Sequence, residues 1–155
     1  MKNAVNRLNT FGNHLFNFTV SLLFVIFAVT RLQKQPKISS DSRIVLFGNT
    51  YNNCYIRFIP NIDLSSQFNI NTKQIFLYCI SKTGRRHEMC WSKIVKRDDP
   101  KTYFQPVRNS YPFKIEEGFN KFDTFTFELR GHIYPYVGMM MDVSYGEFTY
   151  YKNKK

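Results

Sequence analysis

The chain has 155 residues, a formal net charge of +11 and 17% aromatic residues, including 16 Phe and 10 Tyr. Its 7 Gly and 6 Pro exclude collagen-like and proline-rich classes, and its 43% hydrophobic residues argue against a disordered chain. Its 3 Cys are too few, and odd in number, for a disulfide-dense scaffold. A mean hydropathy of −0.36 excludes a polytopic membrane protein, although such an average can hide one apolar segment.

An apolar segment of this kind lies near the N-terminus. Residues 15–29 carry no charge, and a longer version of the run begins at Phe11. At a rise of about 1.5 Å per residue, the two versions reach ~22 Å and ~28 Å, against a bilayer core of ~30 Å. The sequence therefore predicts a transmembrane helix over residues 11–30, preceded by a short segment of residues 1–10.

The residues of this segment leave two interpretations open. A cleaved secretory signal would use Lys2 and Arg7 as its charged start and residues 28–30 as its small-residue exit. An uncleaved signal anchor is favoured, because bulky side chains continue to the end of the run and Arg31 follows directly. Basic residues flank both sides of the span, so charge does not decide which end faces the cytosol.

From residue 36 onward the pattern predicts strands. Apolar and polar residues alternate, or form short apolar runs, in segments 43–47, 54–59, 74–81, 89–96, 122–129 and 142–151. No sustained helical pattern follows residue 35. The expected fold class is all-β: an antiparallel β-sandwich over residues 31–155, behind a single N-terminal transmembrane helix.

A search for chemistry indicates no catalytic, cofactor-binding or metal site. His14, His87 and His132 are scattered and match no metal-binding spacing. Ser92 and Lys93 are adjacent, but neighbours on a strand point to opposite faces, so they do not form a nucleophile and its base. The basic residues around 85–97 carry no nucleic-acid-binding motif. We therefore expect no cofactor, no small-molecule substrate and no nucleic-acid partner.

Two of the cysteines, Cys79 and Cys90, lie in the predicted strands that flank the turn at residues 82–87. In an oxidising lumen they could be cross-strand neighbours joined by a disulfide, with Cys54 left free. A bridge between adjacent strands is uncommon, so two buried thiols are the favoured interpretation, and the disulfide stays open.

One stretch of the sequence resembles the hallmark of a known family. Residues 63–78 read DLSSQFNINTKQIFLY. The signal peptidase complex subunit 3 family has Asp-Leu, an apolar residue leading into Asn-x-Asn-Thr-Lys-Gln, and then an alternation of apolar residues with Phe and Tyr. The segment that begins at Trp91 is similar to the family's Trp-x-x-Ile strand, and residues 135–138 resemble its Pro-x-x-Gly turn. The similarities are collinear over most of the chain.

The sequence also departs from the family's pattern. Ile70 stands where a Trp is usual, and Gly131 stands where the family's Trp-Asn pair begins. The family's usual glycosylation sequon, expected before the strand at residues 122–129, is missing, so glycosylation does not carry over.

The resemblance implies a single-pass type II protein of the endoplasmic reticulum membrane, with cytosolic residues 1–10 and a lumenal domain of residues 31–155. It implies a non-catalytic subunit that supports and positions the catalytic subunit of the signal peptidase complex while signal peptides are removed from secretory proteins. The expected partners are the catalytic and other subunits of that complex, together with the membrane. The candidate family-motif and interface residues are Asp63, Leu64, Phe68, Asn71, Lys73, Gln74, Phe76, Tyr78 and Trp91. The alternative is a secreted or surface β-sandwich binding module with a cleaved signal peptide.

Overall fold

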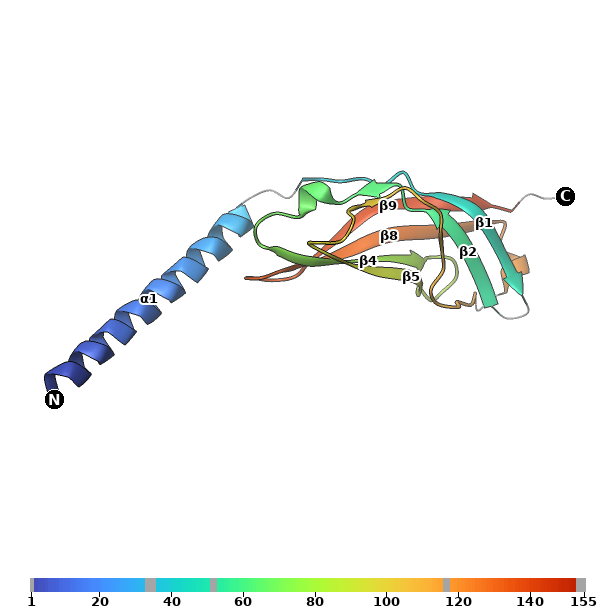
Figure 1. Cartoon of the computed structure of the whole chain (residues 1–155). Helices are drawn as coiled ribbons and strands as arrows, with labels where there is room; N and C mark the ends of the chain where they lie inside the picture. The colour runs from blue at the N-terminus through green and yellow to red at the C-terminus, as the bar shows by residue number, and fades with distance from the viewer. Residues whose placement is uncertain (1, 33–35, 51–52, 116–117, 153–155) are drawn as a thin grey trace.

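The computed structural model describes residues 2–32, 36–50, 53–115 and 118–152. It begins with one long helix, α1 (Lys2–Leu32), which extends away from the β-strands at one end of the molecule (Figure 1). Within this helix, Asn3–Thr30 is long and apolar enough to cross a membrane. The helix is longer than the predicted span of residues 11–30, since residues 2–10 are helical as well.

Three threonine hydroxyls inside α1 form hydrogen bonds within the helix itself. The hydroxyls of Thr10, Thr19 and Thr30 each donate a hydrogen bond to the carbonyl four residues earlier, at 2.8–2.9 Å. A hydroxyl bonded in this way presents no unsatisfied donor to lipid, which lowers the cost of placing these threonines in a membrane.

The strands form antiparallel sheets, as predicted. The larger sheet has four strands in the order β5-β4-β8-β9, and the smaller has three in the order β1-β2-β7. A third, two-stranded sheet pairs β3 with β6. The bounds are β1 (Arg43–Thr50), β2 (Asn53–Ile59), β3 (Ile62–Asp63), β4 (Thr72–Ser81), β5 (Glu88–Lys96), β6 (Thr102–Tyr103), β7 (Val107–Arg108), β8 (Thr124–Pro135) and β9 (Met141–Tyr151), with short 3-10 helices at η1 (Ser65–Gln67) and η2 (Phe119–Lys121).

Each of the six predicted strands is confirmed, several of them with longer bounds. The largest extension is in β8, which continues from the predicted end at Leu129 to Pro135. The strands β3, β6 and β7 were not predicted, because a strand of two residues is too short to show a period of two.

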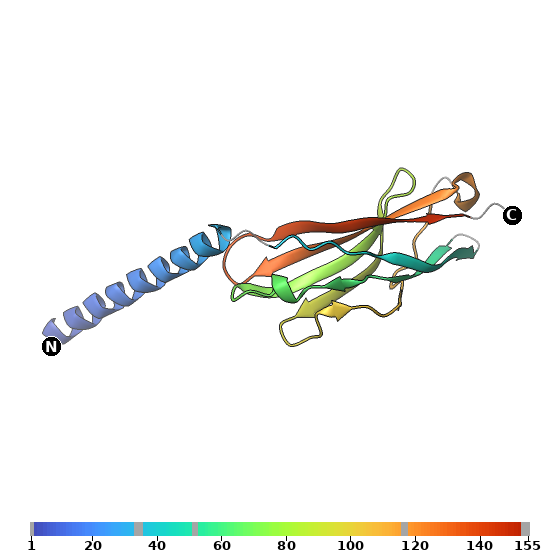
Figure 2. The ribbon, with the colours of Figure 1, turned by 90° about the horizontal axis from the view of Figure 1, so that it is seen from above.

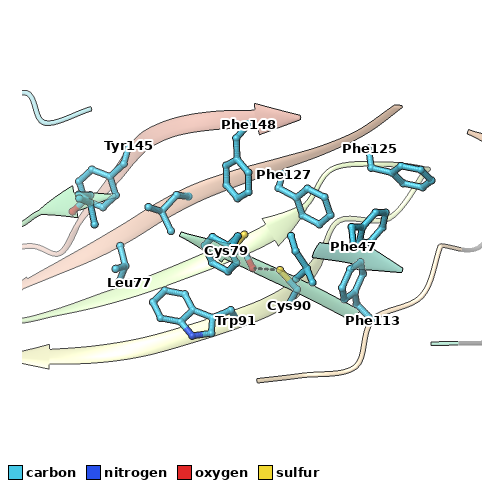
Figure 3. Packing of buried hydrophobic residues seen from close by; sticks show 14 of the residues in the cluster. Phe47, Leu77, Cys79, Cys90, Trp91, Phe113, Phe125, Phe127, Tyr145 and Phe148 are labelled. Atoms are coloured by element: carbon cyan, nitrogen blue, oxygen red, sulfur yellow. Dashed lines mark hydrogen bonds between the residues drawn. The ribbon is translucent and has the colours of Figure 1, made fainter. Parts of the chain in front are cut away.

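The core lies between the two larger sheets and is largely aromatic (Figure 3). Phe58 of β2 stacks on Phe148 of β9 with ring centroids 5.4 Å apart, and Phe47 of β1 meets Phe127 of β8 edge-on at 5.5 Å. Aromatic pairs in these geometries contribute about 0.5–1.5 kcal/mol beyond the area that they bury. Six of the 16 Phe are buried in this core, whereas five others lie in α1.

The cysteines are free thiols in this core. Cys54, Cys79 and Cys90 are all buried. Cys79 is registered with Trp91 across the ladder, while Cys90 occupies a bulge and its Sγ donates to the Cys79 carbonyl at 3.3 Å (Figure 3). Burial raises the pKa of the Cys79 thiol well above its usual value.

Candidate functional site

The motif of residues 63–78 begins with a turn between β3 and η1. The Asp63 carboxylate accepts hydrogen bonds from the Ser65 N–H at 2.8 Å and from the Ser65 hydroxyl at 2.6 Å. These bonds lower the pKa of Asp63 and fix the chain direction. The next side chain, Leu64, is fully buried in the core. The Asp-Leu pair therefore shapes the fold.

The loop that follows is held by polar contacts that the sequence reasoning missed. Arg97, at the end of β5, donates to the carbonyls of Asn69 and Thr72 at 2.6 and 3.1 Å. The buried Gln67 side chain accepts a hydrogen bond from the Tyr145 hydroxyl at 2.5 Å. Phe68 packs against the core with Lys101 over its ring, 4.5 Å from the centroid. Gln67 lies in a mostly polar stretch, so the sequence pattern did not indicate that its side chain is buried.

Asn71 connects three segments that are distant in sequence. Its side chain is buried, donating to the Val137 carbonyl at 2.7 Å and accepting from the Val137 N–H at 2.9 Å. Its amide nitrogen also donates to the Thr30 hydroxyl of α1 at 3.3 Å. The Asn71 backbone carbonyl accepts from the N–H of Tyr136 at 2.8 Å. A single amide thereby ties the helix, the start of β4 and the β8–β9 turn together.

Gly138 completes this contact. Its φ of +112° lies in the region that favours glycine, and a Cβ built on it would lie 3.0 Å from the Phe27 ring of α1. We call the contact between the helix and the sandwich, made by Phe27, Thr30, Asn71, Val137 and Gly138, the α1 junction. These residues also line a small pocket.

Three other motif residues lie together on the outward side of the four-stranded sheet. Phe76 is registered with Ile94 of β5 and His132 of β8, and Tyr78 with Ser92 and Arg130. The rings of Phe76 and Tyr78 stack with centroids 5.4 Å apart. We call this surface the outer face, and it comprises Gln74, Phe76, Tyr78, Ile94, Glu128, Arg130, His132 and Asp142.

The other two candidates lie elsewhere. Lys73 is exposed at the start of β4. Trp91 is only 6% exposed and meets Phe58 edge-on in the core, with ring centroids 5.6 Å apart. Sequence reasoning thus selected a mixture of core, junction and surface residues, and only Gln74, Phe76 and Tyr78 share the outer face.

A network of charges borders the aromatic part of the outer face. The Tyr78 hydroxyl lies 3.2 Å from Nε2 of His132 and donates to Asp142 at 3.4 Å, and Arg130 pairs with Asp142. Burial alone would raise the pKa of Asp142, but the hydrogen bond and charge of Arg130 outweigh it, so the pKa is lowered. The carboxylate therefore stays charged and paired beside the Tyr78 ring.

Glu128 is the buried member of this network. Its carboxylate accepts from the Ser144 hydroxyl at 2.6 Å and lies 3.1 Å from Arg130 and 3.4 Å from Lys82. Burial raises the pKa of Glu128, yet the Ser144 hydrogen bond and the two cations lower it more, and the net direction is down. The alternation of Glu128, Arg130 and His132 along β8 was the sequence signal for this network.

Ser92 and Lys93 are the neighbours that were considered above as a nucleophile and its base. Ser92 Oγ lies 3.0 Å from the Tyr111 hydroxyl, and Lys93 is exposed. Among the described residues, no group of three or more His, Cys, Asp and Glu side chains is placed to hold a metal ion. Most family-motif residues of the described part of the chain lie in the core, at the α1 junction or on the outer face.

Two comparisons with known proteins bear on this arrangement. A family model described as "Signal peptidase subunit" matches residues 1–153. "Signal peptidase complex subunit 3" of Saccharomyces cerevisiae is 32% identical over 107 residues, which cover 64% of this chain and 56% of that relative. The match thus spans a little over half the length of this curated relative.

Proposed function

Because the chain belongs to the signal peptidase subunit family, we propose that it is a non-catalytic subunit of the endoplasmic reticulum signal peptidase complex. In this role it supports and positions the catalytic subunit while signal peptides are removed from secretory proteins. The observation that carries the proposal is the family match over residues 1–153, which takes in both α1 and the sandwich. The serine-type chemistry is supplied by another subunit in this proposal.

The proposal includes a type II topology. Residues 1–10 face the cytosol, residues 11–30 cross the membrane and residues 31–155 form the lumenal domain. The apolar stretch Asn3–Thr30 supports a membrane span, and the contacts of Thr30 with Asn71 and of Phe27 with Gly138 support a helix that stays attached to the sandwich. The mass of the mature protein tests it, since the anchor requires that residues 2–30 remain attached. A mature chain that begins after Thr30 would instead favour a secreted module.

The outer face is the surface that we assign to the catalytic subunit. Ile94 is 48% exposed beside the half-buried Phe76, and the charges next to them are already paired. Aromatic and aliphatic side chains at the centre, with paired charges around them, match the composition of protein–protein interfaces. Charges that are paired before binding cost less to cover than charges that must give up water.

Co-purification of the full chain in mild detergent tests the function. The wild-type chain should bring a signal peptidase catalytic subunit with it, and failure to recover that subunit would refute the proposal. The surface is tested separately by Ile94→Asp, with Leu46→Asp as the matched control. Leu46 is 51% exposed and lies on β1 of the other sheet, so the two changes are similar in exposure and chemistry.

The two variants distinguish loss of the binding surface from a general effect of placing an acidic residue on the sandwich. Ile94→Asp should reduce the recovered catalytic subunit about tenfold or more, the effect of losing one interface anchor worth 1.4 kcal/mol or above. Leu46→Asp should leave recovery unchanged. A Phe76→Ala variant should act like Ile94→Asp, whereas Lys73→Ala should not, because Lys73 lies off the outer face. If all folded variants keep the catalytic subunit, the assignment of this surface is wrong.

A further inference from the structure

Four apolar side chains are exposed at the tips of two loops. Ile70, in the loop before β4, is 87% exposed, and Tyr136, Met139 and Met140, between β8 and β9, are 60%, 67% and 51% exposed. Isolated exposed apolar residues are normal on proteins. A group of them on neighbouring loops marks a surface that contacts something other than water.

These two loops lie at the end of the sandwich from which α1 departs. Asn71, next to Ile70, holds Val137 through two hydrogen bonds, so the two tips are side by side. Figures 1 and 2 show the β8–β9 hairpin beside the last turn of α1, with the C-terminus at the opposite end of the sandwich. The apolar tips therefore surround the point at which the helix meets the domain.

The helix sets the depth of these tips relative to a membrane. Thr30 is the last residue of the apolar stretch Asn3–Thr30, and its hydroxyl lies 3.3 Å from the Asn71 amide. If α1 crosses the bilayer over residues 11–30, as proposed above, Asn71 lies near the level where hydrocarbon gives way to headgroups. The flanking tips then lie in the interfacial layer, where Tyr is enriched and apolar side chains insert by about 5–10 Å.

The loop tips themselves carry no acidic residue that would oppose contact with lipid phosphates. The segments 26–32, 36–40, 69–75 and 134–141 contain no Asp or Glu, although Asp41 and Asp142 directly follow two of them. Lys37 and Lys73 are exposed basic residues within them. Among their neighbours, Arg97 is bound to the carbonyls of the Ile70 loop and is followed by Asp98 and Asp99, while Asp142 is paired with Arg130.

We propose that the loop tips Ile70, Tyr136, Met139 and Met140 insert into the interfacial layer of the bilayer that α1 crosses. The sandwich is then held at two places, by the helix and by its own loops, which fixes its orientation relative to the membrane. Lys37 and Lys73 lie beside the tips, where their ammonium groups pair with the phosphates of lipid headgroups. This surface is separate from the outer face.

Depth-dependent fluorescence quenching tests the proposal with the full chain in phosphatidylcholine vesicles. A Met139→Cys variant is labelled with nitrobenzoxadiazole, and the three native thiols are buried, so labelled wild-type protein gives the background. Tyr151→Cys is the matched control, because Tyr151 is 71% exposed near the opposite end. The quencher is phosphatidylcholine with a nitroxide near the top of its acyl chain.

Insertion predicts a blue-shifted label at residue 139 that loses emission in the nitroxide lipid, and a label at residue 151 that does not. Equal, unquenched emission at both positions would overturn the proposal. A label at residue 139 that is unquenched in vesicles, but shifts to the blue in the purified complex, would overturn it in favour of a neighbouring subunit. The vesicles contain only this chain, so the result is independent of whether it binds a catalytic subunit.

A second variant separates insertion from mere tethering by α1. An Ile70→Cys label should be quenched in the otherwise native chain and clearly less quenched when Tyr136, Met139 and Met140 are replaced by Ser. All three replaced side chains are exposed, so their loss leaves the core packing in place. Unchanged quenching of the Ile70 label would show that the helix alone holds the loops near lipid, and would refute a role for the apolar tips.

Discussion

Replacing Asn71 by Ala should destabilise the sandwich more than its single side chain suggests. The change removes two hydrogen bonds to the Val137 backbone, at 2.7 and 2.9 Å, and a longer one to Thr30 at 3.3 Å. A typical bond contributes about 0.5–1.5 kcal/mol, and stranding a buried partner costs about 1–3 kcal/mol, so the loss should be about 2–4 kcal/mol. The β8–β9 turn should loosen first, since Val137 has lost both partners.

Trp91 provides the assay. It is the only tryptophan in the chain, is 6% exposed and lies in the core, so its emission follows unfolding of the sandwich. Urea unfolding of the full chain in detergent should show a lower midpoint for Asn71→Ala with an unchanged slope.

Thr30→Val is the matched control for this prediction. It removes the long bond between the helix and Asn71 but leaves both Val137 bonds intact. It should cost the sandwich less than about 1 kcal/mol, the value of one neutral hydrogen bond. A loss below about 0.5 kcal/mol for Asn71→Ala, in the range of ordinary surface changes, would refute the reasoning. An equal loss for both variants would show that the helix contact, and not the Val137 turn, carries the energy.

Three further predictions concern the core and the outer face. Gly131→Ala should cost about 1–3 kcal/mol in the same assay, because its Cβ would lie 2.7 Å from the buried Tyr145 ring; a neutral result would mean that the ring can shift freely. Without reductant, iodoacetamide should modify all three cysteines in denaturant and none in the native protein; a single modified thiol in denaturant would reveal a disulfide. Because the folded pKa of Glu128 is below its usual value, its contribution to stability should be complete at pH 6–7 and disappear as pH falls below about 4.5 through the folded pKa. Urea midpoints measured over this pH range should fall less for Glu128→Gln than for wild type, and parallel curves would contradict the assignment.

The sequence predicted the architecture because the long strands carry a clear period. In β8, the alternation placed Phe125, Phe127 and Leu129 on one side, and the structure buries all three. The same alternation placed Glu128 on the other side, and there the usual inference of solvent exposure fails: it is 4% exposed, because Lys82, Arg130 and Ser144 from neighbouring segments cover it. The alternation indicates which face of the sheet a residue occupies, but it does not indicate which neighbouring side chains cover that face.

The α1 junction could not be predicted from the pattern for a different reason. Asn71 lies 41 residues from Thr30 and 66 from Val137, so its partners are set by tertiary structure alone. The family resemblance selected Asn71 without saying what it does, and the geometry supplies its partners. The two-residue strands β3, β6 and β7 are in the same category, since each forms only where another segment pairs with it.

The continuity of the motif at residues 63–78 has a physical reason in this arrangement. Its first part forms the turn at Asp63 and the core contact of Leu64, its middle part is the α1 junction at Asn71, and its last part is the strand that carries Phe76 and Tyr78. β4 begins at the residue after Asn71, and β8 ends two residues before Val137. The two central strands of the outer face therefore start and finish at the contact with α1. In consequence, if α1 spans the membrane as we propose, the residues that fix α1 against the sandwich also fix the height and direction in which the outer face is presented above it.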